Sequence, residues 1–165
     1  MSIWGKLLAG TFGFALGGPI GALLGVIAGH SVDKIRKQKA NFNGNVQSPQ
    51  EVITIGIIIL AAKLAKADGQ VTSDEVSAFK EKFKIPPDFQ SDVGKIFNEA
   101  KKNSEDYHQY AQQLGMIFRG QPQVLEQIIN LLFFIAEADG EISSPEITFI
   151  EGCAKYFGLN KNQYE

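Results

Sequence analysis

Two short acidic stretches, ADGQVTSDE at Ala67–Glu75 and ADGEISSPE at Ala138–Glu146, contain residue types that bind calcium. An EF-hand loop has oxygen ligands at positions 1, 3 and 5, glycine at position 6 and glutamate at position 12. If the aspartate is position 5, both stretches supply the glycine and the glutamate. The first and third ligand positions are then Leu64 and Lys66 in one copy, and Ile135 and Glu137 in the other. Neither stretch is therefore a complete calcium loop.

The same residues also suit a junction between two helices. A left-handed glycine ends the first helix, and a hydroxyl residue caps the second with a glutamate three positions later. A hydrophobic residue before the cap packs inward. The expected junction residues are Gly69, Val71, Thr72 and Glu75 in the first copy, and Gly140, Ile142, Ser143 and Glu146 in the second.

Capping does not explain the two aspartates, because a helix C-terminus disfavours negative charge. One interpretation is a turn carboxylate held by hydrogen bonds. The alternative is that the two turns meet across a pseudo-twofold axis and share a divalent metal ion. Its predicted ligands are Asp68, Glu75, Asp139 and Glu146. No other cofactor is predicted.

An internal repeat predicts the elements that position these turns. A shift of 71 residues aligns the apolar run Ile57–Ala65 with Ile128–Ala136. The second copy, VLEQIINLLFFIAEADG, has helical spacing, so both copies are predicted to be a buried helix, a turn and a second helix. Phe133 and Phe134 in the second copy are expected in the core rather than in a ligand site.

Three further stretches also have the pattern of helices. Residues 86–103 begin at two prolines, residues 104–120 can end at Gly120, and a third helix start falls at Asn160 with Gln163 in the capping-box position. The expected inner faces are Phe89, Val93, Ile96 and Phe97 in the first stretch, and Tyr107, Tyr110, Leu114, Ile117 and Phe118 in the second. We therefore predict an all-α body built from two pseudo-repeated helix–turn–helix halves.

An uncharged stretch of 23 residues, Leu7–Gly29, precedes this body. As a helix it would span about 34 Å, enough to cross a bilayer core of about 30 Å. A signal peptide, the alternative, has an apolar region of only about 7–15 residues. We predict a single transmembrane helix, with the basic residues after it holding the body in the cytoplasm and the N-terminus outside. The predicted division is an anchor at residues 1–40, a linker at 41–49 and a helical domain at 50–165.

Glycine recurs at every fourth residue of this span, at Gly13, Gly17, Gly21, Gly25 and Gly29. Such a stripe lets two helix backbones approach closely in lipid, so we predict that the span forms a homodimer. The alternative is a glycine-rich span that only tolerates these residues. Pro19 can kink the helix within the stripe.

Composition and motifs exclude several classes of function. The formal net charge is −2, and the first 40 residues hold five basic side chains against one acidic. A basic neck on an acidic body lacks the broad basic face of a nucleic-acid-binding protein. Cys153 is the only cysteine, which is typical of a reducing compartment. No P-loop, dinucleotide fingerprint, HExxH motif or nucleophile elbow is present, so no enzyme is predicted. His108, beside Glu105 and Asp106, is expected on a solvated helix face.

The paired ADG-x-[VI]-[ST]-x-x-E turns resemble the TerB domain, named for tellurite-resistance proteins. WGK at Trp4–Lys6, the glycine-phased span and GHSVDKIRKQK at Gly29–Lys39 resemble the anchor of the DjlA-like, DnaJ-like co-chaperones. The resemblance implies a regulatory or interaction module, facing the cytoplasm on a dimerising span in a bacterial inner membrane. It also implies metal binding at the acidic turn positions. The alternative function is therefore a divalent-metal-binding stress protein of the tellurite-resistance type.

In such co-chaperones a C-terminal J domain stimulates the ATPase of the chaperone DnaK through a His-Pro-Asp motif. Here His30 is followed by Ser31 and His108 by Gln109, so the motif is missing. DnaK is expected as a partner only if a J domain is present in the full-length protein. The helix start at Asn160 suggests either a chain cut before a J domain or a short relative with a divergent end.

Overall fold

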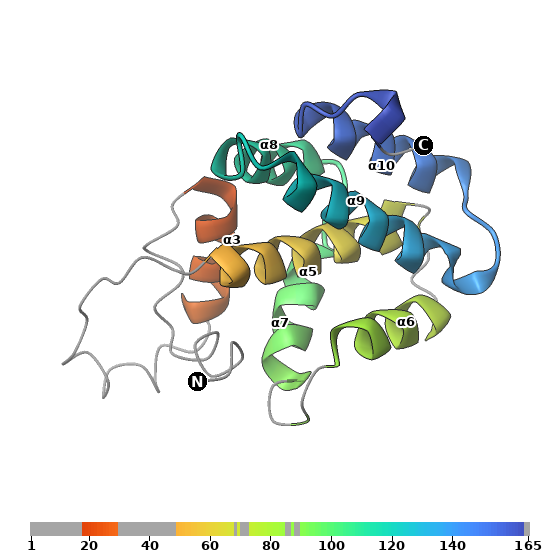
Figure 1. Ribbon diagram of the computed structural model, residues 1–165. Coiled ribbons are helices and arrows are strands. Elements are labelled where there is room, and N and C mark those ends of the chain that lie inside the picture. The colour runs from red at the N-terminus through yellow and green to blue at the C-terminus, as the bar shows by residue number, and fades with distance from the viewer. Residues whose placement is uncertain are drawn as a thin grey trace.

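A computed structural model describes residues 18–29, 49–67, 69, 73–84, 87 and 90–163 of the chain. Every regular element among these residues is a helix, which confirms the all-α prediction (Figure 1). The elements are α3 (Gly18–Gly29), α5 (Pro49–Ala67), α6 (Ser73–Phe83), α7 (Gln90–Ala100), α8 (Tyr107–Ile117), α9 (Pro122–Ala136), η2 (Glu137–Asp139), α10 (Ser144–Tyr156) and η3 (Lys161–Gln163).

Helix α5 forms the centre of the core. All residues from Ile55 to Ala65 are buried, and α7, α8, α9 and α10 pack against this helix. Figure 1 shows α5 crossing the middle of the body between these elements. A helix that is apolar all round must be covered by other elements, and here four helices cover it.

The predicted repeat is present in the structure. Helix α6 begins at Ser73 and α10 begins at Ser144, so the second helix of each half starts at the same place in the 71-residue repeat. The first helices of the two halves, α5 and α9, pack against each other. In both halves, therefore, the ADG turn connects a core helix to a second helix, as predicted.

Helix α8 agrees with its predicted inner face at most positions. Tyr110, Leu114 and Phe118 are buried. Ile117, however, is 40% exposed, so its assignment to the inner face was wrong. Ile117 is the last residue of α8 and the chain turns after it, which takes its side chain away from the core while Phe118 enters it.

Two other predicted helix starts had different outcomes. Helix α7 is described from Gln90 to Ala100, and its predicted start at Pro86 lies outside the described residues. At the other site, the Asn160 N–H donates to Gln163 Oε1 at 2.9 Å, and the short helix η3 follows. The predicted role of Gln163, whose side chain accepts from the backbone N–H at the helix start, is therefore confirmed.

Helices α8 and α10 approach each other closely through glycine. A Cβ atom added to Gly115 would lie 2.7 Å from the carbonyl oxygen of Tyr156, and one added to Gly152 would collide with the Tyr107 hydroxyl. The Tyr107 ring also stacks on Phe149, with the ring centres 4.5 Å apart. The second half is thus packed tightly onto α8.

Candidate functional site

The second ADG turn ends one helix in the predicted way. Helix α9 continues into η2, and Gly140 then has a left-handed φ of 95°. Its N–H donates to the Glu137 carbonyl oxygen at 2.9 Å. A residue with a side chain is strained at this φ, so glycine is the residue that ends the helix with least strain.

Ser143 and Glu146 form a complete capping box at the start of α10. The Ser143 N–H and hydroxyl each donate to Glu146 Oε2 at 2.8 Å, and the Glu146 N–H donates to Ser143 Oγ at 3.3 Å. Glu146 is only 2% exposed. Its carboxylate is therefore already bonded within the helix junction, which confirms the capping prediction for this copy.

The first ADG turn has the same backbone geometry where it is described. Gly69 has a φ of 88°, and its N–H donates to the Lys66 carbonyl oxygen at 2.8 Å. Lys66 is the counterpart of Glu137 in the repeat. Helix α6, which follows this turn, packs against η2, so the two turns lie at the same end of the body (Figure 1). The predicted staple Val71 and cap Thr72 lie outside the described residues.

The predicted metal ligands are described only in part. Asp68 lies outside the described residues, and the same holds for the side chains of Glu75 and Asp139. Only Glu146 is placed, and it is held in its capping box. In the part of the chain that the structure describes, no three Asp, Glu, His or Cys side chains gather as metal ligands would. The four-residue metal site therefore stays a prediction.

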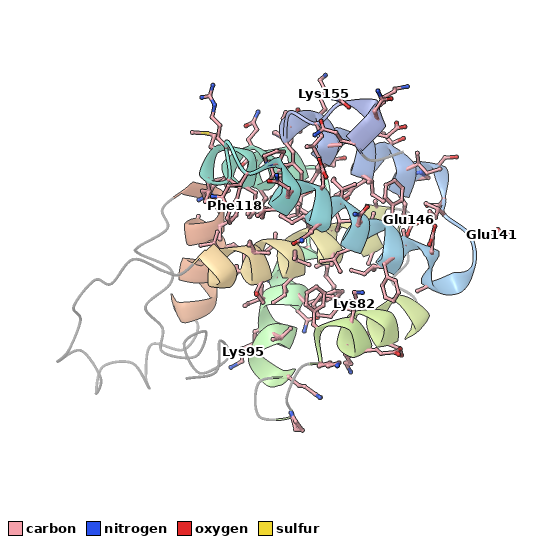
Figure 2. The ribbon with its side chains drawn as sticks, in the orientation of Figure 1. Lys82, Lys95, Phe118, Glu141, Glu146 and Lys155 are labelled. Atoms are coloured by element: carbon pink, nitrogen blue, oxygen red, sulfur yellow. The ribbon has the colours of Figure 1, made fainter. Side chains whose placement is uncertain are left out.

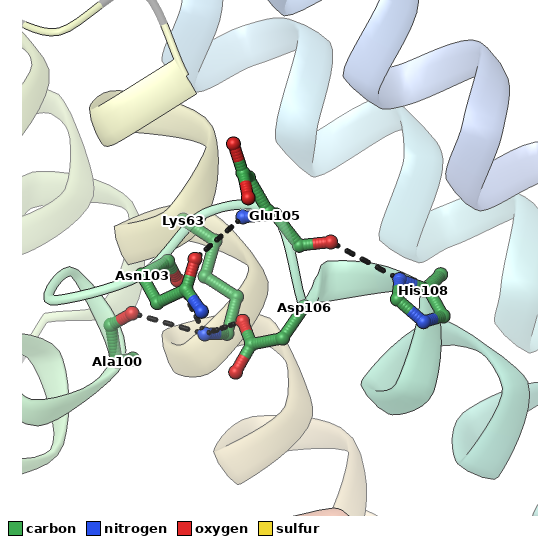
Figure 3. Close-up of polar contacts among 6 residues, drawn as sticks. All are labelled: Lys63, Ala100, Asn103, Glu105, Asp106 and His108. Carbon is green, nitrogen blue, oxygen red and sulfur yellow. Dashed lines mark hydrogen bonds and ion pairs between the residues drawn. The ribbon is translucent and has the colours of Figure 1, made fainter.

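A buried lysine, which the sequence analysis did not single out, connects α5 to the end of α7 (Figure 3). Lys63 is 1% exposed. Its Nζ donates to the carbonyl oxygens of Ala100 at 3.0 Å and Asn103 at 2.7 Å, and to Asp106 Oδ1 at 2.5 Å. Carbonyl groups at the C-terminus of a helix attract a cation, and the carboxylate completes its set of acceptors. We call Lys63, its three acceptors and Tyr110 the Lys63 cluster.

Tyr110 contributes its ring to the Lys63 cluster. The Lys63 Nζ lies 4.6 Å from the centre of the Tyr110 ring, which is a cation–π distance. Burial, together with the negative charges of Asp106 and Glu99, raises the pKa of Tyr110 to about 12. Across the described chain, every buried side-chain nitrogen and oxygen has a hydrogen-bond partner. This saturated arrangement suits a structural clamp between helices rather than a reactive group.

His108 lies close in sequence to the Lys63 cluster but has other partners. Its Nδ1 is 3.1 Å from the Glu105 carbonyl oxygen, whereas the Asp106 carboxylate faces Lys63 (Figure 3). The His108 ring also lies near the ring of Tyr156, with centres 6.1 Å apart. No histidine–carboxylate pair for acid–base chemistry is formed among these residues.

The described part of the predicted span is α3, which packs against α7 and α8. Ile20 and Leu23 are buried there, and the Ile20 N–H donates to Gln113 Oε1 at 2.9 Å. Of the glycine stripe, Gly21 is buried in this contact, Gly25 and Gly29 fall within α3, and Gly13 and Gly17 lie outside the described residues. None of the helices described here combines the length and the apolar character needed to cross a bilayer.

Comparison with known families divides the chain into two matched parts. Residues 54–165 match the family described as tellurite resistance protein TerB. Residues 1–48 match the co-chaperone DjlA transmembrane domain. No solved structure matches the chain.

Curated relatives align with nearly the whole chain. A co-chaperone protein DjlA from Photobacterium profundum is 27% identical over 99% of the chain and 63% of its own length. Those from Legionella pneumophila and Escherichia coli K12 are 25% and 21% identical, over 94% and 100% of the chain and 55% and 62% of their own lengths. The chain thus spans less than two thirds of the length of these relatives.

Proposed function

Because the chain belongs to the TerB family and its first 48 residues match the DjlA transmembrane domain, we propose that it is a membrane-anchored interaction module of a DjlA-like co-chaperone. The observation that carries the proposal is that the two matches follow each other within one chain. The body binds partner proteins at the membrane or positions a J domain beside DnaK, and it catalyses no reaction itself. Nucleic acid is not among its ligands.

The anchor is a single-pass helix of a bacterial inner membrane, with the N-terminus outside and the body in the cytoplasm. The basic residues that follow Gly29 support this orientation through the positive-inside rule. A span over Leu7–Gly29 requires α3 to leave the face of α7 and α8, so the packed and the spanning arrangements of α3 exclude each other.

Membrane fractionation with protease treatment tests the proposed anchoring. The full chain is expected to stay in carbonate-washed membranes, and its body is expected to be digested in inverted vesicles but protected in intact spheroplasts. Residues 45–165 alone are expected in the soluble fraction. Release of the full chain by carbonate, or digestion of the body in spheroplasts, would refute the proposal.

The span is also proposed to form a homodimer through its glycine stripe. Gly17→Leu combined with Gly21→Leu places bulky side chains where two backbones would meet, and is expected to abolish self-association in a membrane two-hybrid assay. A matched pair, Leu8→Ala with Ile27→Ala, changes the span on the side opposite the stripe and is expected to keep self-association. Self-association retained by the Gly17→Leu, Gly21→Leu variant would contradict a homodimer formed through the glycine stripe.

A second candidate function is divalent-metal binding by the two turns. Its support is that α6 packs against η2, which brings the two turns to one end of the body. Glu146 would have to exchange capping-box bonds for the metal, so the site would alter the start of α10. Thermal melting with calcium, zinc or EDTA tests this candidate function. A bound metal is expected to shift the melting temperature by several degrees, and Asp68→Asn combined with Asp139→Asn is expected to abolish that shift. Equal melting under all conditions would exclude metal.

A further inference from the structure

An open groove runs between α6 and α7 on a face that no other described element covers. Its volume is about 210 Å³. Val76 and Phe79 of α6 and Val93 and Phe97 of α7 line it with apolar surface. The Phe79 and Phe97 rings lie 5.9 Å apart, so the two helices already touch beneath the groove. The groove therefore has an apolar lining, and the two helices contact each other at its base.

A glycine keeps the middle of this groove open. Gly94 lines it, and a Cβ atom added there would meet nothing within 4 Å. Gly94 lies inside α7 and has no left-handed φ, so the local backbone does not require glycine. Because Gly94 has no side chain, a ligand can approach the backbone of α7 closely.

The charged side chains along the groove are both basic. Lys80 lies on the α6 side and Lys101 follows the end of α7, and no acidic side chain lines the groove among the described residues. Figure 2 shows a third lysine, Lys95, on the other side of α7 and pointing away from α6. The groove is thus apolar inside and positive along its edges, which is complementary to an apolar ligand flanked by negative charges.

The shape of the groove favours a helix as its ligand. From Gln90 to Lys101 the groove follows about three turns of α7, or roughly 16 Å at about 1.5 Å per residue. Both walls are helices, whose backbone groups already bond within each helix. An extended strand would find no backbone partners there, whereas a helix satisfies its own backbone and needs only side-chain contact.

We propose that the groove between α6 and α7 binds an amphipathic helix of a partner protein, with an apolar stripe in the groove and acidic residues beside Lys80 and Lys101. This rests on the proposed role as an interaction module and names the surface and the kind of partner. The stripe would have apolar residues at i, i+4, i+7 and i+11, the spacing that keeps one helix face in contact over three turns.

A fluorescent peptide tests the groove on the full chain in phosphatidylcholine nanodiscs. The probe is an 18-residue alanine-based helix with leucine at i, i+4, i+7 and i+11 and glutamate on its flanks, and fluorescence anisotropy reports binding. Gly94→Leu fills the groove and is expected to weaken binding at least tenfold. Lys80→Glu with Lys101→Glu is expected to do the same. Lys155→Glu, an exposed lysine on α10 distant from the groove in Figure 2, is the matched control and is expected to bind as the unaltered chain does.

This proposal would be overturned by absence of binding, by binding that Gly94→Leu leaves unchanged, or by equal binding of a peptide with lysine in place of glutamate. Self-association that Gly94→Leu abolishes would assign the groove to a second copy of the chain and would also overturn it. Circular dichroism confirms that each variant is folded. A chain that stays in the membrane but does not bind the peptide refutes only the proposed groove. A chain that is not anchored but still binds the peptide refutes only the proposed function.

Discussion

Helices α5 and α9 derive from one repeated unit, but they occupy different places in the body. Matching positions such as Ile57 and Ile128 are buried in both helices. Elsewhere they differ: Ile59 is buried, while its counterpart Asn130 is exposed. Four helices cover α5, whereas α9 keeps one side open to solvent. The shared apolar pattern therefore defines the inner face of each helix. The neighbouring elements determine how much more of the helix surface is buried.

The largest contrast lies at the pair Lys63 and Phe134, which the 71-residue shift aligns. The charged residue is buried, and the aromatic residue is 43% exposed. The expectation that Phe134 belongs to the core was therefore wrong, and Phe133 is half-buried. The Lys82 Nζ lies 4.9 Å from the centre of the Phe134 ring and covers part of it. Figure 2 places Lys82 on the side of α6 that faces α9.

Alanine at these two matched positions is expected to give the largest difference. Lys63→Ala removes the partner of Asp106 and of two carbonyl oxygens, and is expected to lower the free energy of unfolding by about 3 kcal/mol. Phe134→Ala removes a half-exposed ring and is expected to cost about 1 kcal/mol or less. Urea unfolding of both variants measures the difference. Equal losses would mean that the Lys63 cluster is not a clamp.

Glycine at the centre of α5 offers the second test. A Cβ atom at Gly56 would lie 2.7 Å from a Leu114 methyl carbon, so Gly56→Ala is expected to cost about 1–3 kcal/mol by overpacking. The matching position in α9 is the exposed Gln127, where alanine is expected to change stability by at most about 0.5 kcal/mol. Thermal melting of the two variants compares them. A stabilised Gly56→Ala variant would show that α5 and α8 have room between them.

The two helix caps give a smaller effect and test whether the halves are equivalent. Ser143→Ala removes the hydroxyl of the capping box and is expected to cost about 1 kcal/mol. Thr72→Ala, at the matching position, is expected to cost about the same. Urea unfolding measures both. A loss at Ser143 alone would show that the first junction does not use the predicted cap.

The last test has no effect near neutral pH and appears only under alkaline conditions. The pKa of Tyr110 is raised from 10.0 to about 12 in the folded chain, so the unfolded chain loses this proton first. Stability from this group is complete below pH 10 and declines as the pH rises towards 12. Tyr110→Phe is expected to reduce this alkaline loss, and Tyr156→Phe, at a partly exposed ring, serves as the control. If Tyr110→Phe and the unaltered chain lost stability identically with rising pH, the alkaline loss could not be assigned to Tyr110.

Local pattern predicted the helices and the ADG junctions because these depend on nearby residues. Gly140, Ser143 and Glu146 act within a few positions of one another, so their roles follow from spacing. The Lys63 cluster could not be predicted in the same way, because Asp106 lies 43 residues away. Lys63, the lone lysine in the apolar run IIILAAKLA, was the signal that a buried partner exists, but it does not say which residue that is.

The exposed side of α9 was not predictable for a related reason. Phe134 continues the apolar pattern of buried neighbours, and only the arrangement of the other helices leaves it partly uncovered. The turn aspartates Asp68 and Asp139 are the part of the predicted site that capping still does not explain. Their role depends on whether the two turns bind a metal ion between them.

Hydrogen–deuterium exchange in α5 and α9 of the full chain tests most directly whether the two copies are a central and an outer helix. Backbone amides of residues 55–65 are expected to exchange slowest, at the rate of global unfolding, because opening α5 exposes the whole core. Amides on the outer side of α9, around Asn130, are expected to exchange through smaller openings and therefore faster. Exchange in α5 that equals or exceeds that in α9 would contradict the assignment of α5 as the central helix.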